Sequence, residues 1–257
     1  MRKVYLGTEE ISDKLRLGSE RVELPFTEQL SIEYMAIAGG GGGGGAFNRA
    51  AGGGGAGRFV SSSYELPVSG TFAITIGNGG AVDSNGGNTT LIGSGLTIRM
   101  QGGGAGGDSQ VDGGDGQNGG SGGGGCQEFI GGTYQGGNET NSGVVSDLTG
   151  VGFDGQDGGP SGGGQTGAGA GGGPSVQWLD GITYGNGGTA QGIVHTAKGS
   201  GGRGGDVSTP AATAGIAGVV KIRYQGEVAR ATGGTITYSN GYVYHTFNVD
   251  GTFQRFY

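Results

Sequence analysis

Hydrophobic and polar residues alternate along this chain in short segments that are typical of β-strands. Residues 70–76, 96–100 and 219–224 alternate apolar or β-branched residues with polar ones, and residues 32–38 are mostly apolar. A period of two residues predicts a strand with one face toward a core. Shorter apolar pieces of the same kind occur at 58–60 and 90–92. We therefore expect an all-β fold.

The N-terminus carries a short repeat, in which residues 3–11 and 14–22 are similar in sequence. Each copy predicts a hairpin, because Gly-Thr in the first and Gly-Ser in the second separate two apolar pairs. Two such hairpins are too small to bury a core. They are interpreted as an assembly element that binds a partner, with a local β-cap as the alternative.

The C-terminus also predicts hairpins, since Asn240-Gly241 and Asp250-Gly251 separate strand-like runs. These dipeptides are favoured in two-residue hairpin turns. Residues 226–257 are therefore expected to form a three-stranded β-meander. Its aromatic side chains are expected to pack in a core.

Glycine dominates the middle of the chain. Of the 71 glycines, 2 lie in residues 1–38 and 5 in residues 219–257, so 64 fall between 39 and 218. This divides the chain into residues 1–30, a glycine-rich domain over 31–225, and residues 226–257. Such a composition ordinarily indicates disorder. Collagen is excluded because the chain has only 5 prolines and no Gly-X-Y triplet repeat. The interleaved strand patterns argue against disorder.

Glycine loses more backbone entropy on folding than any other residue. Glycine runs therefore stay ordered only where the structure requires the absence of a side chain. Extended threefold polyglycine II helices meet this condition: they rise about 3.1 Å per residue and bond to neighbouring helices through backbone N–H and C=O groups. A polyglycine II rod bundle with short β-strands is therefore expected. Its expected rods are 39–45, 52–57, 102–107, 113–125, 158–173 and 199–205.

Charge and cysteine content narrow the function classes. The net charge of −7 is spread without a basic block, which disfavours nucleic acid as a partner. The single cysteine, Cys126, excludes an intrachain disulfide and offers no metal cluster. Neither a secretion signal nor a run of about 18 apolar residues is recognised, so synthesis in a cytoplasm is expected.

Candidate catalytic chemistry is sparse. His195 and His245 have no recognisable nucleophile arrangement, no carboxylate pair stands out for glycan hydrolysis, and no Gly-Lys-Ser/Thr follows a glycine run. Aspartates between glycines could bind calcium, as in glycine-rich calcium-binding repeats. However, the nonapeptide spacing of those repeats is missing, and Asx turns explain why aspartate occurs at these positions. These aspartates are Asp108, Asp112, Asp115, Asp154 and Asp157. We expect no enzymatic activity, no cofactor and no metal.

The order of these elements resembles the glycine-rich domain of tail fibres and related virion proteins of tailed bacteriophages. The resemblance rests on Tyr34 to Ala38 with the following glycines, on 52–60, 70–80 and 218–224, and on a similar tail end at 231–234, 244–247 and 251–253. It covers about residues 30–257. The N-terminal repeat resembles attachment segments of phage structural proteins, which implies attachment through Tyr5, Leu6, Gly7, Leu15, Leu17 and Gly18.

The resemblance implies an adhesin in which loops between rods contact the host receptor. Segments 126–156 and 174–198 depart most from glycine and are the expected contact loops. Sugars bind aromatic faces together with amide and carboxylate groups. The expected receptor-binding residues are Gln177, Trp178, Asp180, Tyr184, Phe129, Tyr134 and Asn138. The alternative for the aromatic residues is packing, with Trp178 anchoring its loop on the rods.

The leading hypothesis is a tail fibre or receptor-binding adhesin in the virion tail. It would attach to phage tail or baseplate proteins through residues 1–30 and bind a host surface glycan or outer-membrane protein. A homo-oligomer, with a trimer favoured, is expected because isolated hairpins need partners. A head or tail decoration protein is the alternative. An ice-binding or surface-coating role is disfavoured by the irregular placement of threonines.

Overall fold

The structure of the protein is a computed structural model. The structure describes residues 4–6, 9–11, 15–17, 20–22, 29–45, 49–109, 114–127, 134–140, 175–190, 193–206 and 211–256. Within these ranges every regular element is a β-strand, and all strand pairs are antiparallel. The expected all-β fold is confirmed. No helix in the described part of the chain is long and apolar enough to cross a membrane.

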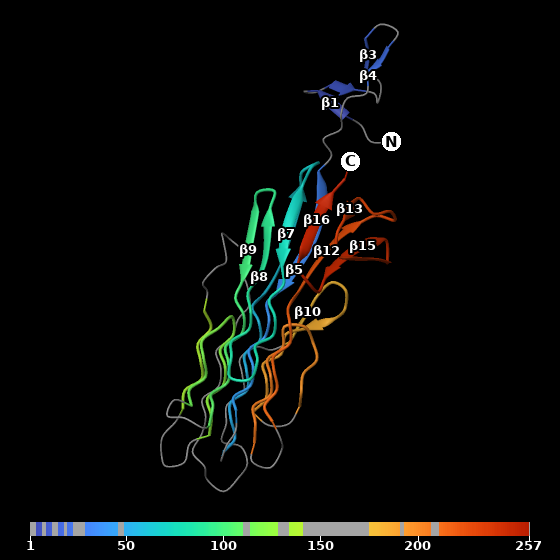
Figure 1. The fold of residues 1–257 in the computed structure, drawn as a ribbon. Coiled ribbons are helices and arrows are strands. Elements are labelled where there is room, and N and C mark those ends of the chain that lie inside the picture. Colours follow the sequence, from blue (N-terminus) through green and yellow to red (C-terminus); the bar gives the residue numbers. More distant parts are fainter. Residues whose placement is uncertain are drawn as a thin grey trace.

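Two five-stranded sheets face each other in a sandwich (Figure 1). The first sheet has the order β14 (Thr235–Ser239), β15 (Tyr242–Phe247), β12 (Val219–Gln225), β5 (Leu30–Ile37) and β6 (Phe59–Leu66). The second has the order β13 (Ala231–Thr232), β16 (Gly251–Arg255), β7 (Thr71–Thr75), β8 (Thr89–Gly93) and β9 (Leu96–Met100).

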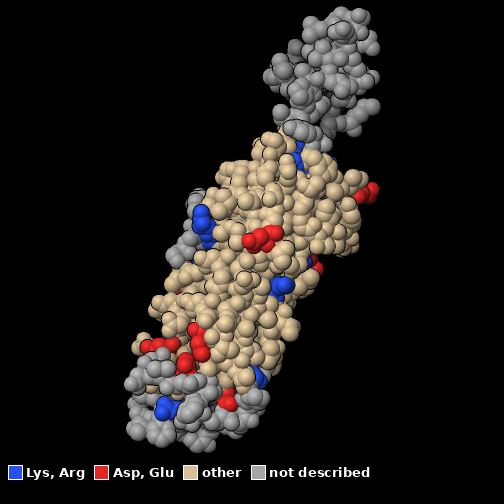
Figure 2. All heavy atoms as spheres, in the orientation of Figure 1, with Lys and Arg blue, Asp and Glu red and all other residues tan. Residues whose placement is uncertain are grey.

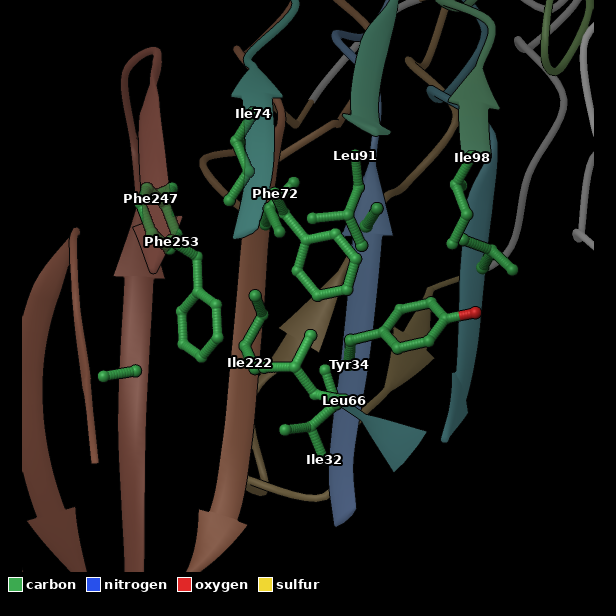
Figure 3. Close-up of a cluster of buried hydrophobic side chains, with 14 of the residues drawn as sticks. Ile32, Tyr34, Leu66, Phe72, Ile74, Leu91, Ile98, Ile222, Phe247 and Phe253 are labelled. Atoms are coloured by element: carbon green, nitrogen blue, oxygen red, sulfur yellow. The ribbon is translucent and has the colours of Figure 1, made fainter. Parts of the chain in front are cut away.

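The main hydrophobic core lies between the two sheets (Figure 3). Alternation along β5 places Ile32 and Tyr34 in this core, while Met35 and Ile37 belong to a second cluster on the outer face of the first sheet. In the second sheet, Phe72 and Phe253 stack with ring centroids 6.2 Å apart. The strands that the period-two pattern predicted are present, and β5, which is mostly apolar in sequence, is buried on both faces.

The C-terminal β-meander is a wrong prediction. β14 and β15 do form a hairpin, with Asn240 (φ 50°) and Gly241 (φ 76°) in the left-handed region that a two-residue turn requires. However, β16 pairs with β7 and β13 in the opposite sheet. The chain changes sheets after Phe247, which lets Phe247 and Phe253 enter the same core, and Asp250 Oδ1 accepts the Ile76 N–H at 2.8 Å. Residues 226–257 therefore supply strands to both sheets.

The two N-terminal hairpins are confirmed at the level of the backbone. β1 (Val4–Leu6) pairs with β2 (Glu9–Ile11), and β3 (Leu15–Leu17) pairs with β4 (Glu20–Val22). They form separate two-stranded sheets and are not joined to either sheet of the sandwich. The expected turn residues Gly7 and Gly18 lie outside the described residues.

Glycine-rich segments extend side by side from one end of the sandwich (Figure 1). In run 39–45, successive N–H groups donate to different neighbours, and the pattern repeats every third residue. Gly39 and Gly42 donate to segment 84–87, Gly40 and Gly43 donate to 213–216, and Gly41 and Gly44 donate to 52–55. The donor distances lie between 2.9 and 3.1 Å.

The carbonyl groups of the same run accept from three further segments. Carbonyls 40 and 43 accept from 80–83, carbonyls 39, 42 and 45 from 103–109, and carbonyls 41 and 44 from 202–205. Run 39–45 is therefore surrounded by six bonded segments. The arrangement satisfies the backbone polar groups of a buried, non-sheet segment.

Side chains are excluded along Gly39 to Gly44 by the neighbouring backbone. A Cβ built on any of Gly39 to Gly44 would lie only 1.8–2.1 Å from a carbonyl oxygen of another segment. Of the expected rods, 39–45, 52–57, 102–107, 199–205 and the described part of 113–125 take part in the network, and 158–173 lies outside the described residues. Segments 77–88 and 211–218 also take part, although they contain fewer glycines.

Candidate functional site

The bundle has two ends with different surroundings. Its proximal end adjoins the sandwich, where Ala38 bonds to Arg58 and Gly218 bonds to Gly77. At its distal end, the N–H of Ser109 donates to the Gly45 carbonyl, and that of Asp83 donates to the Gly43 carbonyl. Figure 2 shows a largely uncharged surface with several acidic side chains near the distal end.

A hollow of about 410 Å³ lies at the distal end, lined by Asp83, Ser84, Asn85, Gly106, Asp108, Asp115 and Gln117. Burial and the neighbouring Asp108 raise the pKa of Asp83, against the lowering effect of the Gly45 N–H that it accepts. Asp115 Oδ1 accepts the N–H of Gln135 at 2.7 Å. In the described ranges, no three His, Cys, Asp or Glu side chains are arranged to hold a metal ion. Asp112, Asp154 and Asp157 lie outside those ranges.

A second candidate region lies on the outer face of the first sheet. There, the hairpin of β10 (Val176–Gln177) and β11 (Thr183–Tyr184) covers β5, β12 and β15. Trp178 and Tyr184 join Met35, Ile37, Phe59, Val219 and Tyr244 in the second hydrophobic cluster. The indole Nε1 of Trp178 donates to Ser61 Oγ at 2.9 Å, and its ring meets Tyr244 edge-on with centroids 6.5 Å apart. The hairpin is therefore anchored by its own aromatic residues.

Asp180 links this hairpin to β12. Its Oδ2 accepts from Lys221 Nζ and from the Tyr184 hydroxyl, both at 2.6 Å, and its Oδ1 accepts the Ile182 N–H at 3.0 Å. Burial alone would raise the pKa of Asp180, but these donors outweigh it and hold the pKa below 3.8. Burial and the Asp180 carboxylate together raise the pKa of Tyr184 far above its usual value. The carboxylate is thus ionised and fully engaged near neutral pH.

Arg223 is fixed beside the same hairpin. Its Nε donates to Glu33 Oε2 at 2.7 Å, and its guanidinium carbon lies 4.3 Å from the centre of the Tyr242 ring. Burial would lower the pKa of Arg223, but Glu33 and the Tyr244 hydroxyl raise it. Arg223 Nη1 also donates to the Leu179 carbonyl at 3.1 Å, so both charged residues of β12 hold the hairpin in place.

Between the hairpin and β14 the surface is hollowed. This flank hollow has a volume of about 210 Å³ and is lined by Leu179, Asp180, Ile182, Lys221, Thr237, Ser239, Asn240, Tyr244 and Thr246. The register explains why these residues meet: Lys221 lies opposite Thr246, and Thr237 lies opposite Tyr244. All four face the outer side of the sheet.

The structure brings Gln177, Trp178, Asp180 and Tyr184 together, but on the flank of the sandwich and not at the distal end of the bundle. Trp178 is only 4% exposed and Tyr184 only 2%. Neither ring face is therefore open to a sugar, and packing is the interpretation of Trp178 that its burial supports. Gln177 is exposed, and its Nε2 donates to the Gly181 carbonyl at 2.9 Å.

The other expected receptor-binding residues lie elsewhere. The segment containing Tyr134 and Asn138 runs beside 114–125, where Asn138 N–H donates to Asn118 Oδ1 at 2.7 Å. Asn138 is exposed and Tyr134 is half-buried. Phe129 lies outside the described residues, as do the side chains of Tyr5, Leu6, Leu15 and Leu17.

Sequence reasoning missed Lys221, Thr237, Ser239 and Thr246, which form much of the flank hollow. Their alternation with the core residues of β12, β14 and β15 was a visible signal. That signal identifies an outer face but not what covers it. Only the pairing of distant strands and the position of the β10–β11 hairpin bring these side chains together.

The fold and these sites define an all-β sandwich extended by a bundle of glycine-rich segments. The family model described as "Glycine-rich domain" matches residues 20–225, so the chain belongs to that family. No curated protein and no solved structure matches the chain.

Proposed function

We propose that the glycine-rich segments are polyglycine II rods packed in a hexagonal bundle. The support for this proposal is the donor pattern of run 39–45, which returns to the same neighbour every third residue. A threefold helix has this period. Six neighbours around one run are also the number expected in hexagonal packing.

We further propose that the protein is a virion structural protein of a tailed phage, acting as a tail fibre or receptor-binding adhesin. The observation that carries this proposal is the bundle itself, which holds chain segments far from the sandwich with their backbone groups satisfied. A rigid scaffold of this kind is suited to presenting loops, because loop sequence can vary without disturbing the backbone packing.

In this proposal the two ends of the molecule have different roles. The N-terminal hairpins attach the protein to tail or baseplate proteins, since each hairpin is too small to be stable alone. Loops of the glycine-rich domain contact a host surface glycan or outer-membrane protein. The assembled protein is a homo-oligomer, with a trimer favoured.

Deletion of residues 1–22 in the phage genome tests the attachment role. Purified particles should then lack the protein by immunoblot and adsorb poorly to host cells. Particles that retain the protein at the normal level contradict attachment through these hairpins. Particles that lose the protein but adsorb normally contradict the receptor-binding role.

A further inference from the structure

The flank hollow between the β10–β11 hairpin and β14 is lined in part by hydroxyl groups that the fold does not use. The hydroxyls of Thr237, Ser239 and Thr246 make no hydrogen bond with any residue that the structure describes. They come from adjacent strands and face the same side of the sheet. Polar groups gathered in a concavity and not engaged by the protein are available to a ligand.

Lys221 adds a donor at the floor of the hollow. Its Nζ donates one hydrogen bond to Asp180 at 2.6 Å. An ammonium group carries three donors, so two remain for other acceptors. The Lys221 and Asp180 side chains are only 13% and 9% exposed, which holds the ammonium in one place.

The walls combine this polar floor with apolar rims. Leu179 and Ile182, which line the hollow from the hairpin, are 52% and 51% exposed. Their side chains can cover an apolar ligand surface without any rearrangement of the core. The hollow therefore offers apolar contacts on the hairpin side and hydroxyl groups on the β14 side.

This chemistry selects among ligand classes. A metal ion is disfavoured because the only carboxylate in the lining, Asp180, already accepts three hydrogen bonds. An anion is disfavoured because Asp180 neutralises Lys221. The volume of about 210 Å³ corresponds to about seven water molecules. A small neutral ligand with many hydroxyls and an apolar face fits best.

We propose that the flank hollow binds a single sugar ring, with Thr237, Ser239, Thr246 and Lys221 contacting its hydroxyls and Leu179 and Ile182 covering its C–H face. This site lies on the side of the sandwich, away from the distal end of the bundle. It does not depend on the proposed virion role, because it requires only the folded chain.

Saturation-transfer NMR on the purified full chain tests the site with a panel of free sugars: glucose, galactose, mannose, rhamnose and N-acetylglucosamine. At least one should receive saturation from the protein. The double variant Thr237→Ala/Ser239→Ala should weaken its binding by at least about tenfold, since each lost hydrogen bond weakens binding several-fold. Thr237→Trp, which fills the hollow, should abolish binding.

Thr235→Ala is the matched control, because Thr235 lies on the same strand and opposite Thr246 but outside the lining. It should leave binding unchanged. Thr235, Thr237 and Ser239 are all exposed, so the variants retain the fold. The proposal is overturned if no sugar receives saturation, if the double variant binds normally, or if the control weakens binding equally.

Discussion

Gly41 donates its N–H to the carbonyl oxygen of Gly55 at 2.9 Å, from inside a ring of neighbouring segments. A Cβ on Gly41 would lie 2.1 Å from the carbonyl oxygen of Gly104. The bonding and the exclusion of a side chain are two consequences of the same close packing. Stability of the bundle therefore depends on individual glycines.

Replacing Gly41 with alanine should destabilise the protein by about 3 kcal/mol or more, because backbone on neighbouring segments must move to admit the methyl group. Urea unfolding followed by circular dichroism measures the loss. Ala214→Ser, at an exposed position in an adjoining segment, is the control and should change stability by less than about 0.5 kcal/mol. A Gly41→Ala variant as stable as this control contradicts the packing argument.

Replacing Trp178 with alanine should cost about 3–5 kcal/mol, as expected for a buried tryptophan. The variant loses the contact with Tyr244 and the hydrogen bond to Ser61. Because Trp178 is the single tryptophan, native fluorescence reports on this site alone. Blue-shifted native emission that moves red on unfolding is expected. Solvent-like emission from the folded protein would show that the indole is not packed.

Replacing Asp180 with asparagine should cost about 3 kcal/mol, because the Lys221 ammonium keeps its buried position without a carboxylate. Hydrogen exchange over residues 176–185 should accelerate as the hairpin loosens. The double variant Asp180→Asn/Lys221→Met should recover part of the lost stability. This coupling would be contradicted if the double variant lost more unfolding free energy than the two single variants lose together.

His245 should make stability depend on pH. It is fully buried, with Tyr224 Oη 3.0 Å from its Nε2 and the Gly233 carbonyl 2.8 Å from its Nδ1. Burial lowers its pKa below 6.5, against the raising effect of the Gly233 carbonyl. Below pH 6.5 the His245 imidazole becomes protonated in the unfolded chain, whereas in the folded chain it stays neutral until a lower pH. This contribution is present above pH 6.5 and is lost as pH falls from there through the folded-state pKa.

Urea unfolding at a series of pH values, from about pH 8 to about pH 5, measures this dependence. His245→Gln should flatten it. A wild-type protein whose stability stays constant below pH 6.5 would contradict the assignment of a neutral buried histidine. The Asp180 contribution lies in a separate window, because its pKa is held below 3.8.

Local patterns in the sequence predicted the strands and the glycine network, but not the pairing of distant segments. Tyr34 and Phe253 could be assigned to a core from their alternation, whereas the crossing of β16 to the second sheet could not. Residues 248–251 are compatible with a tight Asp-Gly turn within one sheet and also with a connection to the other sheet. The packing of Phe253 decides between the two, and it depends on strands that are distant in the sequence.

The same limit applies to the candidate site. The sequence assembled Gln177, Trp178, Asp180 and Tyr184 correctly because they are neighbours in the chain. It left packing open as the alternative for Trp178, but it did not predict that Trp178 and Tyr184 pack on a surface formed by β5, β12 and β15. Nor did it predict the flank hollow, whose residues are up to 67 positions apart, from Leu179 to Thr246.

Antibody-gold labelling of this protein on intact virions, viewed by electron microscopy, tests the proposed function most directly. Label is expected at the tail tip, and it should be lost from particles whose gene lacks residues 1–22. Label over the capsid, or particles without any label, would contradict a tail fibre or adhesin.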